Sequence, residues 1–238
     1  MTAGFVYIIE SPSATDLLDG RTEGRALGEA LRLADIPYVY SLTADAATFR
    51  TALRDRLIES WKKHDRAYPI IHLSMHGDTN GIAFTNGDYL SWNDLRSELL
   101  PLIRAMPNAL LICMSSCFGL AGCRIAMHSD DEPHYWGLVG HPGTVGWSDS
   151  AIAYMTFYHL FFKGHGVDHC VMAMKVASGD SDFTYAAGTV TKQSWEDFMR
   201  KQLSPPTAAS SPGVEGLLVA AVRAVRSNVA AASPVDSG

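Results

Sequence analysis

Cysteine is scarce in this sequence, and long hydrophobic runs are missing. Only four of the 238 residues are cysteine, too few for the dense disulfide framework of a small secreted domain. No apolar run approaches the roughly 18 residues that suggest a membrane span. The first ten residues lack the basic and then apolar pattern of a signal peptide. We therefore expect a cytoplasmic protein of a reducing compartment, with no membrane partner.

Basic charge is not in excess either. The formal net charge is −6, from 19 Lys and Arg against 25 Asp and Glu. Nonspecific binding to nucleic acid depends on basic side chains that neutralise phosphates, so we expect no nucleic-acid partner. The Gly-x-Ser-x-Gly, Walker and dinucleotide-binding motifs are also absent, and we infer no cofactor. With 47% hydrophobic residues, the chain is sufficient for one large domain.

Short apolar segments alternate along the chain with segments of helical spacing. The expected strands are 5–9, 38–40, 69–75, 109–114 and 135–140. The expected helices are 22–34, 44–61, 91–104, 148–163, 167–177 and 194–202, and an Asn-Gly pair at 86–87 indicates a small hairpin. This alternation predicts an α/β three-layer sandwich, with a mostly parallel sheet and helices on both faces.

The composition changes near residue 203. Residues 204–212 are rich in Pro, Ser and Ala, which is typical of a linker. Beyond them, apolar residues fall on one helical face at Val214, Leu217, Leu218, Ala221, Val222 and Val225. We therefore expect one domain over residues 1–203, a linker over 204–212, and a C-terminal helical segment and tail over 213–238.

Two of the expected strands end in residues that can carry nucleophilic chemistry. His76 and Gly77 follow the strand 69–75, and Cys117 follows the strand 109–114 after two serines. Ligands of an open parallel sheet bind outside the carboxyl ends of its strands. A crossover of this kind commonly returns the chain to a neighbouring strand. Cys117 and His76 are therefore expected to meet at one edge of the sheet.

These residue types suit acyl transfer through a thiol. A free thiol has a pKa of about 8.5, so little thiolate exists at neutral pH. An imidazole such as that of His76 can take the proton from Cys117 and later give it to a leaving amine. The backbone N–H groups of Gly77 and Cys117 can hold the oxyanion of the intermediate. Glycine at position 77 permits a close approach of the backbone.

The order of these segments resembles the caspase, metacaspase and CHAT group of cysteine peptidases. In that group, one strand ends in His-Gly and a later strand ends in a small residue and Cys; here the separation is 117 − 76 = 41 residues. Segments 136–140, 149–151, 157–158 and 167–178 resemble the later strand, acidic turn and helices of CHAT domains. The resemblance covers roughly residues 5–180. It implies a caspase-like fold and an endopeptidase acting on protein or peptide substrates.

The residues that would set specificity depart from this family. The caspase signature Gln-Ala-Cys-Arg-Gly is absent, because residues 115–119 read Ser-Ser-Cys-Phe-Gly. Metacaspases place Asp two residues before the nucleophile, where this chain has Ser115. In separase-like relatives, an acidic residue after the next strand serves a basic P1 side chain. By that resemblance Asp149 is the candidate substrate-binding residue, and Glu10 is a weaker alternative.

The resemblance also suggests a biological role and leaves two other classes open. Many small bacterial relatives act in antiphage or regulated-cell-death systems, where they cleave a dedicated partner such as a gasdermin-like pore former. An activating protein partner would fit such a system. The first alternative is a caspase-like interaction module without catalysis. The second is a cysteine-dependent hydrolase that acts on small amides.

Other reactive side chains are expected to pack into the core. Cys113 falls inside a strand, Cys170 falls in the expected helix 167–177, and Cys123 is assigned to a helix without delimited bounds. His72 is expected to be a core histidine. The acidic segment 128–134 is expected to be a solvated loop, with an active-site or self-cleavage loop as the alternative. Cys117 and Cys123 lie near two histidines, His128 and His134, but their spacing does not match structural zinc sites. We therefore expect no metal site.

Overall fold

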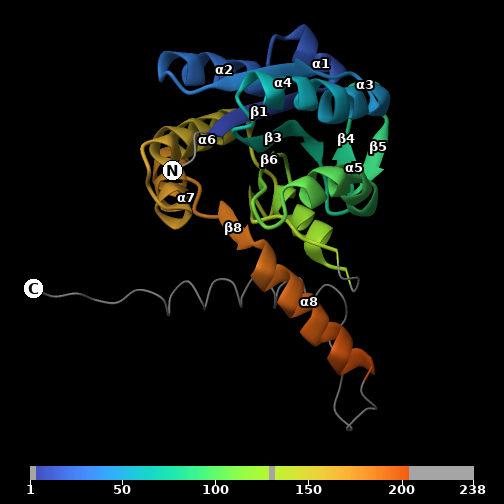
Figure 1. Ribbon diagram of the computed structural model, residues 1–238. Coiled ribbons are helices and arrows are strands. Elements are labelled where there is room, and N and C mark those ends of the chain that lie inside the picture. The colour runs from blue at the N-terminus through green and yellow to red at the C-terminus, as the bar shows by residue number, and fades with distance from the viewer. Residues whose placement is uncertain (1–3, 129–131, 204–238) are drawn as a thin grey trace, which may run out of the picture.

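The computed structural model describes residues 4–128 and 132–203 (Figure 1). The predicted linker 204–212 and the C-terminal segment 213–238 lie outside the described residues. Residues 129–131, in the middle of the acidic segment, also lie outside them.

A single sheet forms the centre of the fold. Its main strands run in the order β2-β1-β3-β6-β7-β8, and every neighbouring pair is parallel except β7 with β8. Their bounds are β1 (Gly4–Ser11), β2 (Tyr38–Leu42), β3 (Tyr68–Gly77), β6 (Leu111–Ser115), β7 (Gly137–Gly140) and β8 (Thr184–Ala187). The predicted mostly parallel sheet is confirmed, and the antiparallel strand β8 at its edge is an addition that the sequence analysis did not predict.

Helices cover both faces of this sheet and make it the middle of three layers. One core contains α3 (Ala46–Thr51), α4 (Leu57–Lys63) and α5 (Trp92–Ala105), and the other contains α2 (Glu23–Leu33), α6 (Trp147–Phe162) and α7 (Val167–Ser178). Strand β1 shows why both faces are apolar. Phe5, Tyr7 and Ile9 face the first core, whereas Val6 and Ile8 face the second, because successive side chains of a strand point to opposite faces.

Several shorter elements complete the chain. The expected helix 44–61 is α3, a π-helical turn (Ala52–Arg56) and α4 in succession, and the expected hairpin is β4 (Gly81–Ala83) with β5 (Tyr89–Ser91). Ser91 and Asp94 form the capping box that begins α5. A short helix α1 (Ala14–Leu18) and a 3-10 helix (Gly119–Ala126) were not delimited from sequence. The last helix, α8 (Gly188–Leu203), begins six residues before the expected 194 and extends away from the body (Figure 1).

Tyr154 connects α6 to the carboxyl ends of strands β6 and β7 by hydrogen bonds. Its side chain is fully buried, and its hydroxyl lies 2.9 Å from the carbonyl oxygen of Met114 and 3.0 Å from that of Val139. One buried hydroxyl therefore serves the carboxyl ends of two adjacent strands, β6 and β7.

The variant Tyr154→Phe should lower the free energy of unfolding by about 1–2 kcal/mol, because it leaves these buried carbonyls without their donor. Urea denaturation measures the loss. Tyr89→Phe is the matched control, because the Tyr89 hydroxyl donates to Asp78 at an exposed position. That control should change stability by less than about 0.5 kcal/mol. Equal losses of unfolding free energy in the two variants would contradict a stabilising role for the Tyr154 hydrogen bonds.

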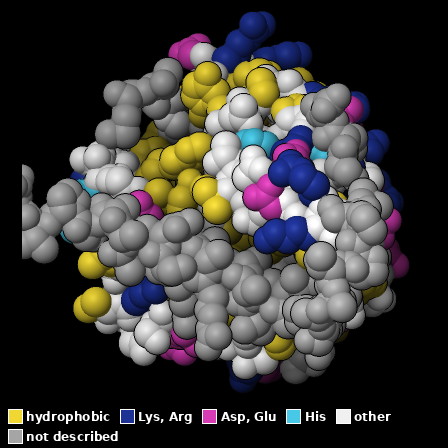
Figure 2. All heavy atoms as spheres, turned by 90° about the horizontal axis from the view of Figure 1, so that it is seen from below, with side chains coloured by type: hydrophobic (Ala, Val, Ile, Leu, Met, Phe, Trp, Pro, Cys, Tyr) yellow, Lys and Arg dark blue, Asp and Glu magenta, His cyan; other side chains and the backbone are white. Residues whose placement is uncertain are grey.

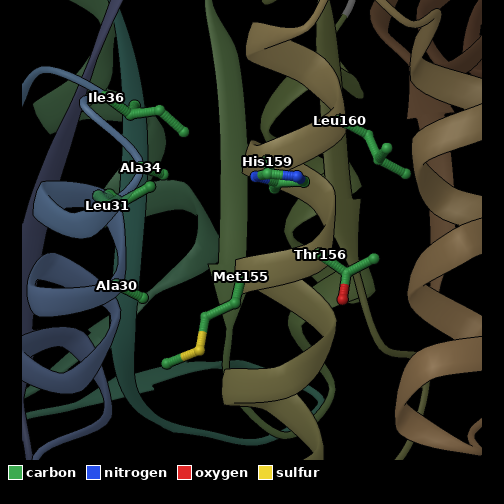
Figure 3. A pocket seen from close by; sticks show the side chains of 8 residues that line it. All are labelled: Ala30, Leu31, Ala34, Ile36, Met155, Thr156, His159 and Leu160. Atoms are coloured by element: carbon green, nitrogen blue, oxygen red, sulfur yellow. The ribbon is translucent and has the colours of Figure 1, made fainter.

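An apolar hollow lies on the surface between residues that do not belong to the predicted site. It has a volume of about 360 Å³ and lies between α2 and α6, where Met155 points toward α2 (Figure 3). None of its lining residues belongs to the predicted site.

On the face seen in Figure 2, hydrophobic side chains gather beside a group of charged ones. Within the described residues, none of the helices has both the length and the apolar character to cross a membrane.

Candidate active site

The two reactive segments lie at the carboxyl ends of neighbouring strands, with His76 and Gly77 as the last two residues of β3. β3 and β6 are parallel hydrogen-bonded neighbours, and Ser74 of β3 is in register with Ser115 of β6. His76 lies two residues beyond Ser74, and Cys117 lies two residues beyond Ser115. The crossover between the strands therefore returns the chain to the adjacent position in the sheet, as the sequence analysis predicted.

The backbones of these two segments touch at Gly77. A Cβ atom built on Gly77 would lie 2.7 Å from the carbonyl oxygen of Cys117 and 3.3 Å from Cβ of Ser116. Real Cβ atoms do not approach a backbone oxygen this closely, so only glycine fits. The structure thus brings Gly77 and Cys117 together, which are the two residues predicted to supply oxyanion donors.

Cys117 differs from the other cysteines in its exposure. It is partly exposed, whereas Cys113, Cys123 and Cys170 are buried and none forms a disulfide. Burial raises the pKa of the Cys113 thiol to about 12 and the pKa values of the Cys123 and Cys170 thiols to about 11. Those three thiols stay protonated and packed, as predicted. Cys117 is followed by Phe118 in the left-handed backbone region (φ 54°), just before the 3-10 helix begins.

The segment 141–146, which follows β7, contacts the Cys117 thiol. The N–H of Val145 donates to Sγ of Cys117 at 3.5 Å, and the thiol donates to the carbonyl of Val145 at 3.7 Å. The N–H of Phe118 donates to the carbonyl of Gly143 at 2.7 Å. Within residues 4–128 and 132–203, no hydrogen bond joins Cys117 to His76. Catalytic hydrogen bonds are often long in free enzymes and tighten only when substrate binds.

The His76 ring has an acidic partner that the sequence analysis did not identify. Its Nε2 lies 2.9 Å from Oδ2 of Asp16 in α1, and its ring meets the Trp147 indole edge-on at a centroid distance of 5.2 Å. The Ser13 hydroxyl donates to the Asp16 carboxylate at 2.7 Å. The Ser13 hydroxyl, together with His76, lowers the pKa of Asp16 below its ordinary value. Asp16 is therefore an anion that is held against the imidazole.

The two acidic residues considered for substrate binding lie in different surroundings. Asp149 is partly exposed in the first turn of α6, two residues after Trp147, and its Oδ1 accepts a hydrogen bond from the Ser148 hydroxyl at 3.4 Å. Glu10 is 1% exposed. Its carboxylate accepts bonds from the N–H groups of Gly24 and Arg25 and from the Tyr40 hydroxyl. Glu10 anchors the start of α2 and is not available to a substrate, which corrects the weaker alternative.

His72 is a core histidine, as predicted. It is fully buried, its Nδ1 lies 3.0 Å from the Tyr158 hydroxyl, and its Nε2 lies 3.5 Å from the Glu23 carboxylate. Its ring also packs edge-on against Tyr154. His72 and His76 are four residues apart on β3, yet only His76 reaches the surface, with 44% of its side chain exposed.

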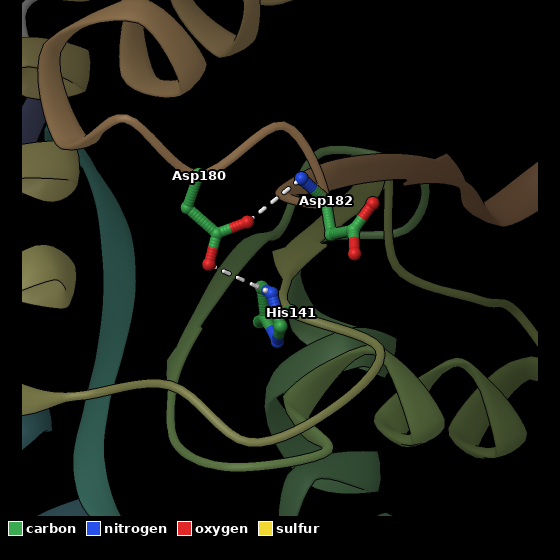
Figure 4. Close-up of side chains that lie close together, drawn as sticks. All are labelled: His141, Asp180 and Asp182. Carbon is green, nitrogen blue, oxygen red and sulfur yellow. Dashed lines mark hydrogen bonds and ion pairs between the residues drawn. The ribbon is translucent and has the colours of Figure 1, made fainter.

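A second His-carboxylate cluster holds the segment 141–146, which contacts Cys117, in place (Figure 4). Nε2 of His141 lies 3.0 Å from Oδ2 of Asp180, and the N–H of Gly143 donates to Nδ1 of the same ring at 3.0 Å. The pair ties the segment 141–146 to the turn before β8. With Asp182 these side chains have ligand atoms within 4.8 Å of one another, the one such group found within the described ranges. The group includes none of Cys117, Cys123, His128 and His134, which were weighed as zinc ligands.

Comparison with known proteins supports the architecture. No family model and no curated protein matches the sequence. Among solved structures, the fold is similar to that of a secreted C11 cysteine protease from Bacteroides thetaiotaomicron in complex with an irreversible peptide inhibitor. The two share a TM-score of 0.54 and 8% sequence identity, over 81% of this chain and 68% of that one. At this identity the likeness concerns the fold. The chain therefore has the α/β sandwich fold of caspase-like cysteine peptidases.

Proposed function

We propose that this chain is a cysteine endopeptidase in which Cys117 is the nucleophile and His76 transfers the proton. The observation that carries the proposal is the contact between Gly77 and the Cys117 carbonyl at the ends of two adjacent strands. It brings a partly exposed thiol and an imidazole with an anionic partner to the same edge of the sheet. The similar fold of a cysteine protease adds support at the level of architecture.

The proposed reaction has two acyl-transfer steps. His76 takes the proton from the Cys117 thiol, and the sulfur attacks the carbonyl carbon of the scissile peptide bond. The resulting imidazolium gives its proton to the leaving amine as the C–N bond breaks, which leaves a thioester on Cys117. A water molecule, deprotonated by His76, then attacks the thioester. The carboxylic acid product leaves and the thiol regains its proton.

The backbone donors of the site would stabilise the charge that develops in each step. We assign the N–H groups of Gly77 and Cys117 to the oxyanion of the tetrahedral intermediates, because preorganised N–H groups stabilise this charge most effectively. The N–H of Val145 already points to the Cys117 sulfur. It would donate to the thiolate that forms when the proton moves to His76.

Specificity and biological role are finer parts of the proposal. We propose that Asp149 selects a basic P1 side chain, since it is partly exposed and close in sequence to Trp147, which contacts His76. A dedicated protein substrate, such as a gasdermin-like pore former in a bacterial antiphage or cell-death system, is proposed on the family resemblance alone. A cytoplasmic location and an activating protein partner belong to the same proposal.

Mass spectrometry of a cleaved peptide library tests the proposed function. The wild-type protein should cut a set of peptides that Cys117→Ala spares, and an electrophilic peptide probe should label Cys117. Cys170→Ala is the matched control for loss of a cysteine, because Cys170 is buried in α7. It should keep the wild-type cleavage pattern.

Three results would contradict the peptidase. Cleavage that persists in Cys117→Ala would assign the activity to another group. A Cys117 that no probe labels would favour an interaction module. Turnover of small amides without any cut peptide would favour a different hydrolase.

A further inference from the structure

We propose that Asp16 is a positioning residue for His76: it fixes the tautomer of the His76 ring and keeps that ring oriented toward Cys117. The inference rests on the proposed function and adds a third member to its machinery. Its basis is the 2.9 Å contact between Nε2 of His76 and Oδ2 of Asp16, two residues that are 60 positions apart in the chain.

The contact decides which nitrogen of His76 can act as a base. An ionised carboxylate accepts hydrogen bonds and cannot donate them. The proton of a neutral His76 must therefore lie on Nε2, where Asp16 accepts it. Nδ1 is then the unprotonated nitrogen, and it is the atom left to take the proton from the Cys117 thiol.

Asp16 is itself held in place and in its charged state. Only 11% of its side chain is exposed, against 44% for His76. The Ser13 hydroxyl donates to Oδ2 of Asp16, and the N–H of Asp16 donates back to the Ser13 oxygen at 3.0 Å. The bond from the Ser13 hydroxyl to the carboxylate is the largest cause that lowers the pKa of Asp16, and His76 and Trp147 contribute. The carboxylate thus stays ionised to a lower pH than an ordinary aspartate does.

An anion at this distance favours the imidazolium that forms when the thiol gives up its proton. The other groups near His76 do not replace it. Trp147 from α6 is uncharged. Asp78, which follows the last residue of β3, accepts from the Tyr89 hydroxyl and from the N–H groups of Asn80 and Gly81. Asp16 is therefore the anion that the structure directs at the His76 ring.

The test compares Asp16→Asn and Asp16→Ala with wild type, with His76→Ala as the reference for loss of the imidazole. Asp19→Asn is the matched control, because Asp19 directly follows α1 and forms its ion pair with Arg21, at 3.4 Å. The first readout is the rate at which iodoacetamide alkylates Cys117 across the pH range, followed by mass spectrometry. The second is kcat and KM on a peptide that the wild-type protein cuts. The third is the ¹⁵N NMR spectrum of the His76 ring.

We expect both Asp16 variants to move the midpoint of the alkylation profile to higher pH by about one unit, because the neighbouring imidazolium loses its counter-charge. We expect kcat to fall by about 10- to 100-fold with little change in KM, since the proton transfer and not binding is affected. The ¹⁵N spectrum of the wild type should show the neutral ring protonated on Nε2. Ser13→Ala keeps the carboxylate and should shift the profile less. Asp19→Asn should match wild type in all three readouts.

The outcomes separate this inference from the function on which it rests. If His76→Ala slows alkylation but both Asp16 variants behave as wild type, the role of Asp16 is wrong and the Cys-His peptidase stands. If His76→Ala also leaves alkylation unchanged, the dyad itself is wrong. A wild-type spectrum with the proton on Nδ1 would overturn the tautomer assignment and the inference with it.

Discussion

His76→Ala is expected to lower kcat/KM for peptide cleavage by about 10³-fold, because general acid–base catalysis typically contributes 10²- to 10⁴-fold. Without the imidazole, the thiol must ionise unaided, and the leaving amine must depart without a proton donor. The side chain is 44% exposed, so its truncation leaves no cavity in the core. The measurement is the cleavage rate of a library-derived peptide, together with a thermal unfolding curve that should match wild type.

Variants of two other histidines serve as controls for this experiment. His159 is exposed on α6 and lines the apolar hollow, so His159→Ala should retain the wild-type rate. His72→Ala should instead lower stability, because it leaves the buried Glu23 carboxylate and the Tyr158 hydroxyl without their partner. A His76→Ala protein that cleaves at the wild-type rate would remove His76 from the mechanism.

The central strands could be predicted because each is apolar on both faces. Val6 and Ile8 pack into one core while Phe5, Tyr7 and Ile9 pack into the other, so the sequence shows an unbroken apolar run. A strand of this kind belongs inside a parallel sheet that is covered by helices on both sides. The order of strands and helices then limits the topology to a few arrangements, of which the α/β sandwich was the simplest.

The elements that were not predicted from the sequence are short, and they depend on contacts with residues that are distant in the chain. β8 has four residues and is a strand only because it pairs with β7, more than forty positions earlier in the chain. α1 has five residues, too few to show helical periodicity. Its one signal was local: Ser13, followed three residues later by Asp16, is the spacing of a helix start.

The difference between regular strands and irregular connections also explains which residues of the site could be predicted from the sequence. His76 lies near the end of β3 and Cys117 lies two residues beyond β6, both recognisable strands, and the ends of adjacent parallel strands must lie together. Asp16 comes from the connection after β1, and Val145 comes from the connection after β7. Neither connection has a regular pattern that fixes its path. Their contacts with His76 and Cys117 depend on the path of the folded backbone, which the local sequence does not specify.

Gly77→Ala is expected to lower kcat by about 10²- to 10³-fold, the range found when one oxyanion donor is lost. The added methyl group would meet the Cys117 carbonyl oxygen at 2.7 Å, and this oxygen belongs to backbone that cannot rotate away. The two segments must therefore separate, which moves the N–H groups of Gly77 and Cys117 out of alignment. Alkylation of Cys117 by iodoacetamide forms no oxyanion, so its rate should fall far less than the rate of cleavage.

That difference between cleavage and alkylation separates oxyanion stabilisation from general damage to the site. Gly166→Ala is the matched control, because a methyl group there meets nothing within 4 Å and should leave both rates unchanged. If Gly77→Ala slowed alkylation as strongly as cleavage, the glycine would serve to place the thiol, and the oxyanion role would be wrong. If it slowed neither, the close approach of the two strand ends would have no part in the chemistry.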